Sequence, residues 1–256
     1  MRALHAEWTK LRTVPSMLWL LAAAAAATVA VSALMTASVH TDQCPSPAEC
    51  FEDTTRLSLS GVHMGQLLVA VLAVLAMSTE FATGMVRTTL AAMPARLRVL
   101  AAKAVVVMVP VLGAAALGVL GSLAVARLIL PGNGFTAVPS LGDEATLRAA
   151  GGTVAYCGLI GLLSLGLAAL VRDAAVAMTT VVGLLYMFPI LARFITSERG
   201  QELIAMYAPL NAGLAVQTTL GVDRAPIGPW AGLGVLALWS AAAMAAGAAR
   251  FVGGDP

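Results

Sequence analysis

Residues 78–103 form the one stretch in which charged and turn-forming residues are spaced for a specific role. The stretch places a carboxylate at Glu80, a glycine at Gly84 and cations at Arg87 and Arg96. These groups can form ion pairs, permit a sharp turn and reach an acidic partner surface. They include no nucleophile next to a base and no metal-ligand cluster, so we expect contact chemistry here and not catalysis.

The chain around this stretch has the composition of a membrane protein. Apolar residues make up 59% of the sequence and charged residues only 11%, far from the balance of a soluble domain. Basic residues are not clustered with aromatic residues, so we expect no nucleic-acid partner. Membrane lipids are the expected surroundings of such a chain. The abundance of Ala, Val, Gly and Arg suggests a bacterial source, and hence the bacterial cytoplasmic membrane.

Six apolar runs are long enough to cross a bilayer, which takes about 20 residues in a helix. The predicted fold is therefore all-α, a single transmembrane domain over residues 1–256. Its spans are residues 16–39, 59–77, 101–130, 148–171, 174–194 and 230–251. No Asp, Glu or Lys lies in the core of a predicted span, which disfavours an ion-coupled transporter.

Residues 1–15 are predicted to form a short amphipathic helix at the membrane interface. Leu4, Trp8 and Leu11 follow helical spacing and form an apolar stripe, whereas Lys10 and Arg12 face elsewhere. A solvated basic leader is the alternative. A cleaved signal peptide is disfavoured because the first apolar run exceeds the roughly 7–15 residues of a signal core.

The distribution of cations predicts that both termini are cytoplasmic. In that orientation the cytoplasmic segments carry nine cations, and these are Arg2, Lys10, Arg12, Arg87, Arg96, Arg98, Lys103, Arg172 and Arg250. The outer segments carry six, spread over longer loops, and these are Arg56, Arg127, Arg148, Arg193, Arg199 and Arg224. Lys and Arg accumulate on the cytoplasmic side of membrane proteins, so residues 78–100 become a cytoplasmic segment.

Two connections between the spans carry further signals. Only Arg172 and Asp173 separate the fourth span from the fifth, which predicts a tight helical hairpin. Residues 195–229 form the longest connection, an outer loop that is only partly polar. Apolar residues at helical spacing inside it predict one or two short helices lying at the membrane surface, and these residues are Leu203, Ile204, Tyr207 and Leu210.

The three cysteines are expected to behave differently. Cys44 and Cys50 lie in the first outer loop, where an oxidising exterior and a short closure favour a disulfide. Two free thiols are the alternative, because spacing alone does not bring the two Cα atoms within about 7 Å. Cys157 lies inside the fourth span and should stay a reduced, packed thiol.

Small residues recur in the spans, as in Gly113, Gly118 and Gly121 of the third and Gly158, Gly161 and Gly166 of the fourth. Such residues allow helices to approach closely in membranes. An alanine- and glycine-rich composition would give the same pattern, so packing and composition are equally good explanations for any one of them.

The sequence also excludes an ATP site of the common kind in this chain. A phosphate-binding loop needs Lys followed by Ser or Thr, but Lys10 precedes Leu11 and Lys103 precedes Ala104. If ATP drives this protein, a different polypeptide binds it. No cofactor and no metal is expected in the chain itself, and no enzymatic activity of its own.

The pattern of residues 78–103 resembles that of the permease subunits of type-2 ABC transporters, most of which are exporters. Glu80, Gly84, Arg87, Leu90, Pro94 and Arg96 carry the resemblance in this segment. The leader Glu7–Thr13, which contains Trp8, Lys10, Leu11 and Arg12, is also similar to that of bacterial members. The six-span layout extends the likeness to nearly the whole chain, although each motif alone is loose.

The resemblance implies a function and a set of partners. In such permeases the leader is an elbow helix, and the segment after the second span is a coupling helix that docks on a cytosolic ATPase subunit. Two permease subunits, alike or different, combine with two ATPase subunits, which bind ATP and magnesium. The fifth-to-sixth loop caps the pathway outside. The expected activity is export of an amphipathic or lipid-like substrate, such as a drug, a peptide or a lipid.

Two other functions compete with a transport subunit. One is a membrane protein that does not transport, such as an immunity or sensor protein that binds a ligand or partner. The other is a membrane enzyme, which the lack of a catalytic cluster disfavours. Co-purification of a cytosolic ATPase would separate the transport subunit from both.

Overall fold

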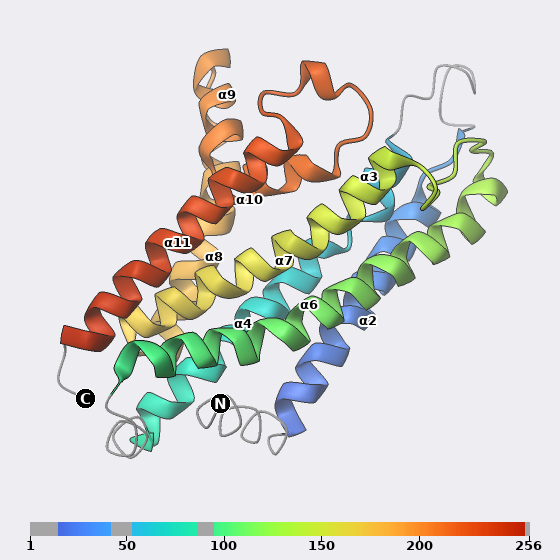
Figure 1. Cartoon of the computed structure of the whole chain (residues 1–256). Coiled ribbons are helices and arrows are strands. Elements are labelled where there is room, and N and C mark those ends of the chain that lie inside the picture. Colours follow the sequence, from blue (N-terminus) through green and yellow to red (C-terminus); the bar gives the residue numbers. More distant parts are fainter. Residues whose placement is uncertain (1–14, 42–52, 86–94, 254–256) are drawn as a thin grey trace.

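The computed structural model describes residues 15–41, 53–85 and 95–253, and these form helices joined by turns and loops (Figure 1). The α-helices are α2 (Pro15–Ser38), α3 (Thr54–Ser58), α4 (Val62–Ala82), α6 (Arg96–Ile129), α7 (Glu144–Val171), α8 (Ala174–Ala192), α9 (Glu198–Tyr207), α10 (Pro209–Leu214) and α11 (Pro229–Gly253). Short 3-10 turns are η3 (Leu130–Asn133), η4 (Ala215–Gln217) and η5 (Val222–Arg224).

Six of the described helices, α2, α4, α6, α7, α8 and α11, are long and apolar enough to cross a membrane. This confirms the prediction of an all-α, multi-pass membrane protein. The predicted elbow helix over residues 1–15 lies almost wholly outside the described residues.

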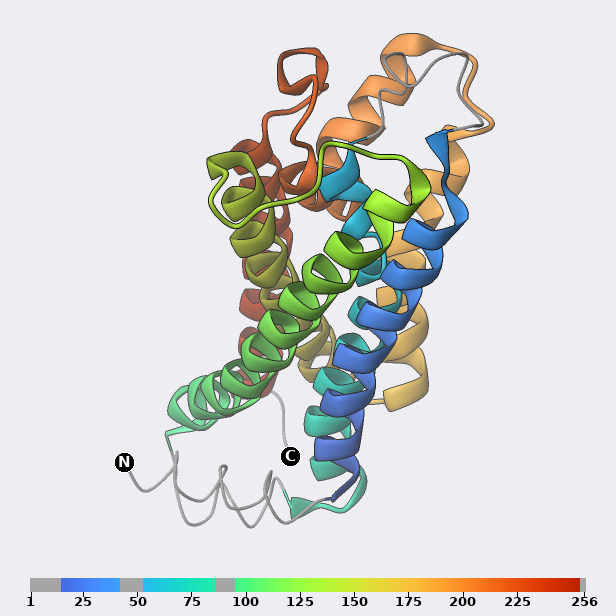
Figure 2. The ribbon, with the colours of Figure 1, turned by 90° about the vertical axis from the view of Figure 1, so that its right-hand side faces the viewer.

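The helix α7 occupies the centre of the bundle and packs against α4, α6, α8 and α11 (Figure 1). The helices α2 and α6 lie side by side on one flank, in blue and green in Figure 2. The helix α8 lies at the periphery, and only three of its residues are buried: Ala177, Val181 and Leu185. A helix with so little protein around it presents most of its apolar surface to the hydrocarbon of a bilayer.

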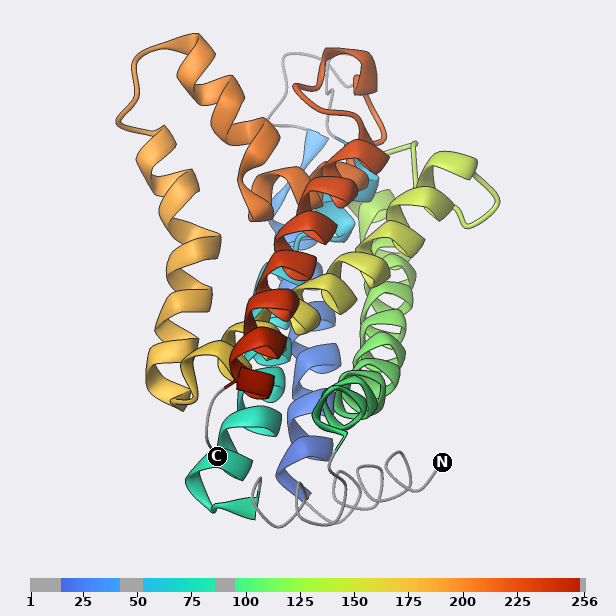
Figure 3. The same cartoon turned by 60° about the vertical axis from the view of Figure 1, so that its left-hand side comes forward.

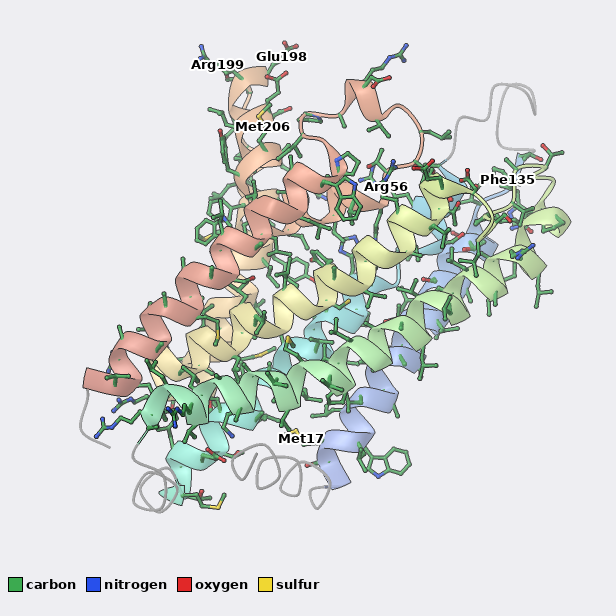
Figure 4. The ribbon with its side chains drawn as sticks, in the orientation of Figure 1. Met17, Arg56, Phe135, Glu198, Arg199 and Met206 are labelled. Carbon is green, nitrogen blue, oxygen red and sulfur yellow. The ribbon has the colours of Figure 1, made fainter. Side chains whose placement is uncertain are left out.

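The helix bundle has two ends, which we name after Glu80 and Arg56, a residue at each end. The Glu80 end contains the start of α2, the end of α4, the start of α6, the α7–α8 turn and the end of α11 (Figures 1 and 3). The Arg56 end contains α3, α9, η5 and the remaining ends of the six long helices. Figure 4 labels Met17 at the Glu80 end and Phe135 at the Arg56 end.

The α7–α8 connection is the tight hairpin that the sequence predicts. Arg172 ends α7 in the left-handed region with φ of 67°, and its N–H donates to the carbonyl oxygen of Ala168. Asp173 then caps α8, because its carboxylate accepts from the N–H of Val176 at 2.9 Å. Two residues therefore suffice to reverse the chain.

The connection between α8 and α11 differs in part from the sequence prediction. One or two short helices were expected, and the structure has two short α-helices there, α9 and α10. No residue of α9 is buried, but α10 lies within the protein, with Leu210, Ala212 and Gly213 among its buried residues. Figure 3 shows α9 turning back from the end of α8 and leading α10 toward α11.

Small residues make this insertion of α10 feasible. A Cβ atom built at Gly213 would lie 2.7 Å from the ring of Tyr156, and one at Gly232 would lie 2.0 Å from the carbonyl oxygen of Ala212. The insertion is also held by hydrogen bonds, since Trp239 Nε1 donates to the carbonyl oxygen of Tyr207 at 3.0 Å. The prediction of helices lying only at the surface was therefore wrong for α10.

A polar chain crosses the apolar core between α4, α7 and α8. Gln66 and Tyr156 are both fully buried, and the Tyr156 hydroxyl donates to Gln66 Oε1. Gln66 Nε2 in turn donates to Tyr186 Oη at 2.8 Å, and Tyr186 Oη donates to the carbonyl oxygen of His63 at 3.1 Å. Gln66, Tyr156 and Tyr186 thus each have a hydrogen-bond partner, as burial of polar groups requires.

Candidate functional site

Glu80 and Lys103 form an ion pair at the Glu80 end of the bundle. Glu80 Oε1 lies 2.9 Å from Lys103 Nζ, and each side chain is only 6% exposed. Lys103 Nζ also lies 3.3 Å from the carbonyl oxygen of Ala76, one turn earlier in α4. The ammonium group therefore has two oxygen acceptors on α4, which compensates part of the cost of burying it.

This ion pair links the two helices that flank the predicted coupling segment. The helix α4 continues to Ala82, past the expected end of the second span at Met77, and α6 begins at Arg96, before the expected start at Ala101. Both charges consequently lie inside long helices and face each other across their contact. The pair fixes the distance between the end of α4 and the start of α6, and hence between the two ends of the connection.

Two arginines tie the same end of the bundle to α11. Arg96 Nη1 donates to the carbonyl oxygens of Phe251 at 3.3 Å and of Val252 at 3.0 Å. Arg172 Nη2 donates to the carbonyl oxygen of Arg250 at 2.9 Å. These carbonyls belong to the last turn of a helix, where main-chain acceptors lack partners within the helix and cations are favoured.

Aromatic contacts complete this arrangement. The Arg172 guanidinium carbon lies 5.4 Å from the centre of the Phe81 ring, a cation–π distance. The Phe81 ring meets the Phe251 ring edge-on, with centroids 6.3 Å apart. We call Glu80, Phe81, Arg96, Lys103, Arg172 and Phe251 the Glu80 cluster. It joins α4, α6, the α7–α8 turn and α11 into one contiguous unit.

Gly84 follows the end of α4 with φ of 69°, in the left-handed region that residues with a Cβ atom rarely adopt. Its N–H donates to the carbonyl oxygen of Phe81 at 3.2 Å. Nothing lies within 4 Å of a Cβ atom built at this position. The glycine is therefore required for the backbone turn that leads the chain away from α4, and not for packing.

The other residues predicted for this site lie outside the described residues. Those of the coupling segment are Arg87, Leu90 and Pro94, those of the elbow helix are Trp8, Lys10, Leu11 and Arg12, and those of the predicted disulfide are Cys44 and Cys50. Of the predicted coupling residues, the structure places Glu80, Gly84 and Arg96. It brings Glu80 and Arg96 into one cluster, with Gly84 at its edge.

The Glu80–Lys103 pair is buried, unlike exposed charge pairs, which contribute only about 0–1 kcal/mol. Glu80 is 5% exposed, and so is Lys103. The sequence prediction ended the second span at Met77, so it did not include the last helical turn of α4, which carries Glu80.

Sequence reasoning also left out Lys103, Arg172, Phe81 and Phe251 as members of the site. Their partners lie on other helices, so no local spacing indicates them. Within the described ranges, no three His, Cys, Asp or Glu side chains are gathered as a metal site. The chemistry that the cluster offers is ion pairing and the mechanical connection of four helix ends.

Comparison with known proteins assigns no family: no protein-family model matches the sequence, and no curated protein matches it.

Proposed function

We propose that the chain is the permease subunit of a type-2 ABC exporter, driven by a separate cytosolic ATPase. The observation that carries this proposal is the buried ion pair between Glu80 in the last turn of α4 and Lys103, two turns into α6, whose Oε1 and Nζ atoms lie 2.9 Å apart. These are the two helices that bound the coupling segment. A force applied to a segment held in this way moves α4 and α6 together. Without this ion pair, the segment between α4 and α6 could move without displacing the two helices.

The surrounding Glu80 cluster extends the same argument to the rest of the bundle. Arg96, at the first residue of α6, is bonded to the last turn of α11. Arg172 connects the α7–α8 turn with α11 and with Phe81 of α4. A displacement of the coupling segment by an ATPase is therefore transmitted to five of the six long helices, and these rearrange between inward-facing and outward-facing states.

The orientation belongs to the proposal. The Glu80 end faces the cytoplasm, because it carries Arg96, Arg98, Lys103, Arg172 and Arg250 close to helix ends. Residues 1–15 act as the elbow helix, and two copies of this chain, or this chain and a related one, combine with two ATPase subunits. The cargo is an amphipathic or lipid-like molecule, and the location is a bacterial cytoplasmic membrane.

The test must distinguish a loss of ATPase docking from a loss of folding. A substitution of Glu80 cannot do so, because breaking a buried ion pair also destabilises the fold. We would purify the tagged chain from its native membrane, identify a co-purifying ATPase, and reconstitute the complex in vesicles. Arg87→Ala lies in the coupling segment. Arg127→Ala, at an exposed residue of the Arg56 end, is the matched control.

Arg87→Ala should reduce ATPase co-purification and substrate-stimulated ATP hydrolysis by about tenfold, without changing the unfolding temperature of the chain. The estimate rests on the roughly 1.5–3 kcal/mol of a hydrogen bond to a charged group. Arg127→Ala should match the parent. A chain that co-purifies with no ATPase, while it binds another protein stoichiometrically, would instead be an immunity or sensor protein.

A further inference from the structure

A pocket of about 480 Å³ opens at the Arg56 end, far from the Glu80 cluster. Its walls come from α3, α4, α9, α10 and η4 and from the loop that carries η5. The volume falls within the roughly 300–1,000 Å³ of small-molecule sites. The lining includes two arginines, Arg56 and Arg224, together with His63, and none of the described residues that line it is Asp or Glu.

The cations of the pocket are available to a ligand. Among the described residues, no ion pair involves Arg56 or Arg224, and both side chains are exposed. A third arginine, Arg148, does not line the pocket but holds one of its lining residues in place, because Arg148 Nη2 donates to the carbonyl oxygen of Thr218 at 2.7 Å. Thr218 itself lines the pocket. The charged side chains that line the pocket among the described residues are therefore both arginines.

The carboxylate of Asp53, three residues before Arg56, is already engaged in hydrogen bonds. Asp53 accepts from the N–H and hydroxyl of Thr219, both at 2.6 Å, and from the N–H of Leu220 at 3.1 Å. It also accepts from the N–H of Arg56 at 3.0 Å. Asp53 thus fastens the loop to α3 and positions Arg56. Asp223, beside Arg224, is exposed and does not line the pocket.

The rest of the lining has a different character. Leu210, Leu214 and Ile227 contribute apolar surface, and Asn211 and Gln217 contribute amide groups. Gln217 is 3% exposed and is held by a hydrogen bond from its Nε2 to Thr153 Oγ1 at 3.2 Å. A pocket lined by both arginines and aliphatic residues matches a molecule that has a charged head and an apolar tail.

We propose that this pocket binds the phosphate or carboxylate group of an anionic amphiphile, with Arg56 and Arg224 holding the anion and Leu210, Leu214 and Ile227 contacting the apolar part. Guanidinium groups bind phosphate and carboxylate through paired hydrogen bonds. In Figure 4, Arg56 lies beneath the loop that carries η5, whereas Arg199 lies at the far tip of α9. The site does not depend on the proposed transport function, because binding is a property of this chain alone.

The test measures binding to the purified full chain in a neutral detergent, by calorimetry. The probes are octyl phosphate, inorganic phosphate and octyl phosphocholine, which has the same tail length and no net charge. Arg56→Gln and Arg224→Gln remove the proposed contacts. Arg199→Gln is the matched control, since Arg199 is an exposed arginine at the same end that does not line the pocket.

Octyl phosphate should bind saturably to the parent, and each pocket variant should weaken binding about tenfold or more, while Arg199→Gln changes it less than twofold. Weak or absent binding of inorganic phosphate identifies an amphiphile site. Equal binding of both phosphates contradicts the amphiphile and leaves a plain anion site. Absence of saturable binding, equal affinity for octyl phosphocholine, or unchanged affinity in both pocket variants overturns the proposal.

Discussion

Gly166 of α7 and Gly247 of α11 face each other where these two helices come closest. A Cβ atom built at Gly166 would lie 2.6 Å from the main-chain carbon of Ala243, and one at Gly247 would lie 2.5 Å from the carbonyl oxygen of Gly166. Each glycine is therefore opposed by backbone, which cannot move aside as a side chain can. The contact between α7 and α11 is the most extensive in the bundle and depends on both residues.

We accordingly predict that Gly166→Ala destabilises the protein by about 1–3 kcal/mol, the usual range for overpacking. Gly113→Ala is the matched control, because nothing lies within 4 Å of a Cβ atom at this helical position. There the gain in helix propensity, up to about 1 kcal/mol, should leave stability equal or higher. Unfolding temperatures in detergent check both, and equal values for the two variants would contradict the packing argument.

The Glu80–Lys103 pair predicts a non-additive result. Glu80→Met or Lys103→Met alone should lower stability by about 3–5 kcal/mol, because each removes the opposite charge that stabilises its buried partner. The double variant Glu80→Met with Lys103→Met removes both charges and should be markedly more stable than either single variant. Denaturant unfolding of the four proteins gives the coupling energy. Losses that simply add would show that the two groups do not interact.

The buried polar chain predicts a cost for a single hydroxyl. In Tyr156→Phe, Gln66 Oε1 loses its donor in a fully buried position, so stability should fall by about 1–3 kcal/mol. Tyr207→Phe is the control, because Tyr207 is 61% exposed and its hydroxyl can bond to solvent or headgroups. Thermal unfolding of both variants decides the matter, and an unaffected Tyr156→Phe would argue against the bond.

The proposed orientation predicts opposite labelling of two exposed arginines. In a variant with Cys44, Cys50 and Cys157 replaced by alanine, Arg98→Cys at the Glu80 end should react with a membrane-impermeant maleimide only after the cells are lysed. Arg199→Cys on α9 should react in intact cells. The reverse pattern would place the Glu80 end outside and remove the basis for an ATPase at that end.

Hydropathy along the chain was sufficient to predict six membrane-spanning helices and the all-α class. Span formation in a bilayer depends on local sequence, since every main-chain polar group must be satisfied within its own helix. The two-residue turn at Arg172 and Asp173 was predictable for the same reason. Its geometry rests on the left-handed Arg172 and the cap from Asp173, both of which are contacts within a few residues.

Only the tertiary structure decided which of these local features act together. Gly113 and Gly166 are equivalent in sequence, yet one faces open space and the other the backbone of α11. Leu210 continued the helical pattern of α9 but lies buried in α10, and Glu80 looked like a loop charge but pairs with Lys103. In each case the deciding partner lies on another helix. Hydropathy and spacing report the neighbours along one helix, whereas packing between helices sets which of its faces meets protein, lipid or a buried charge.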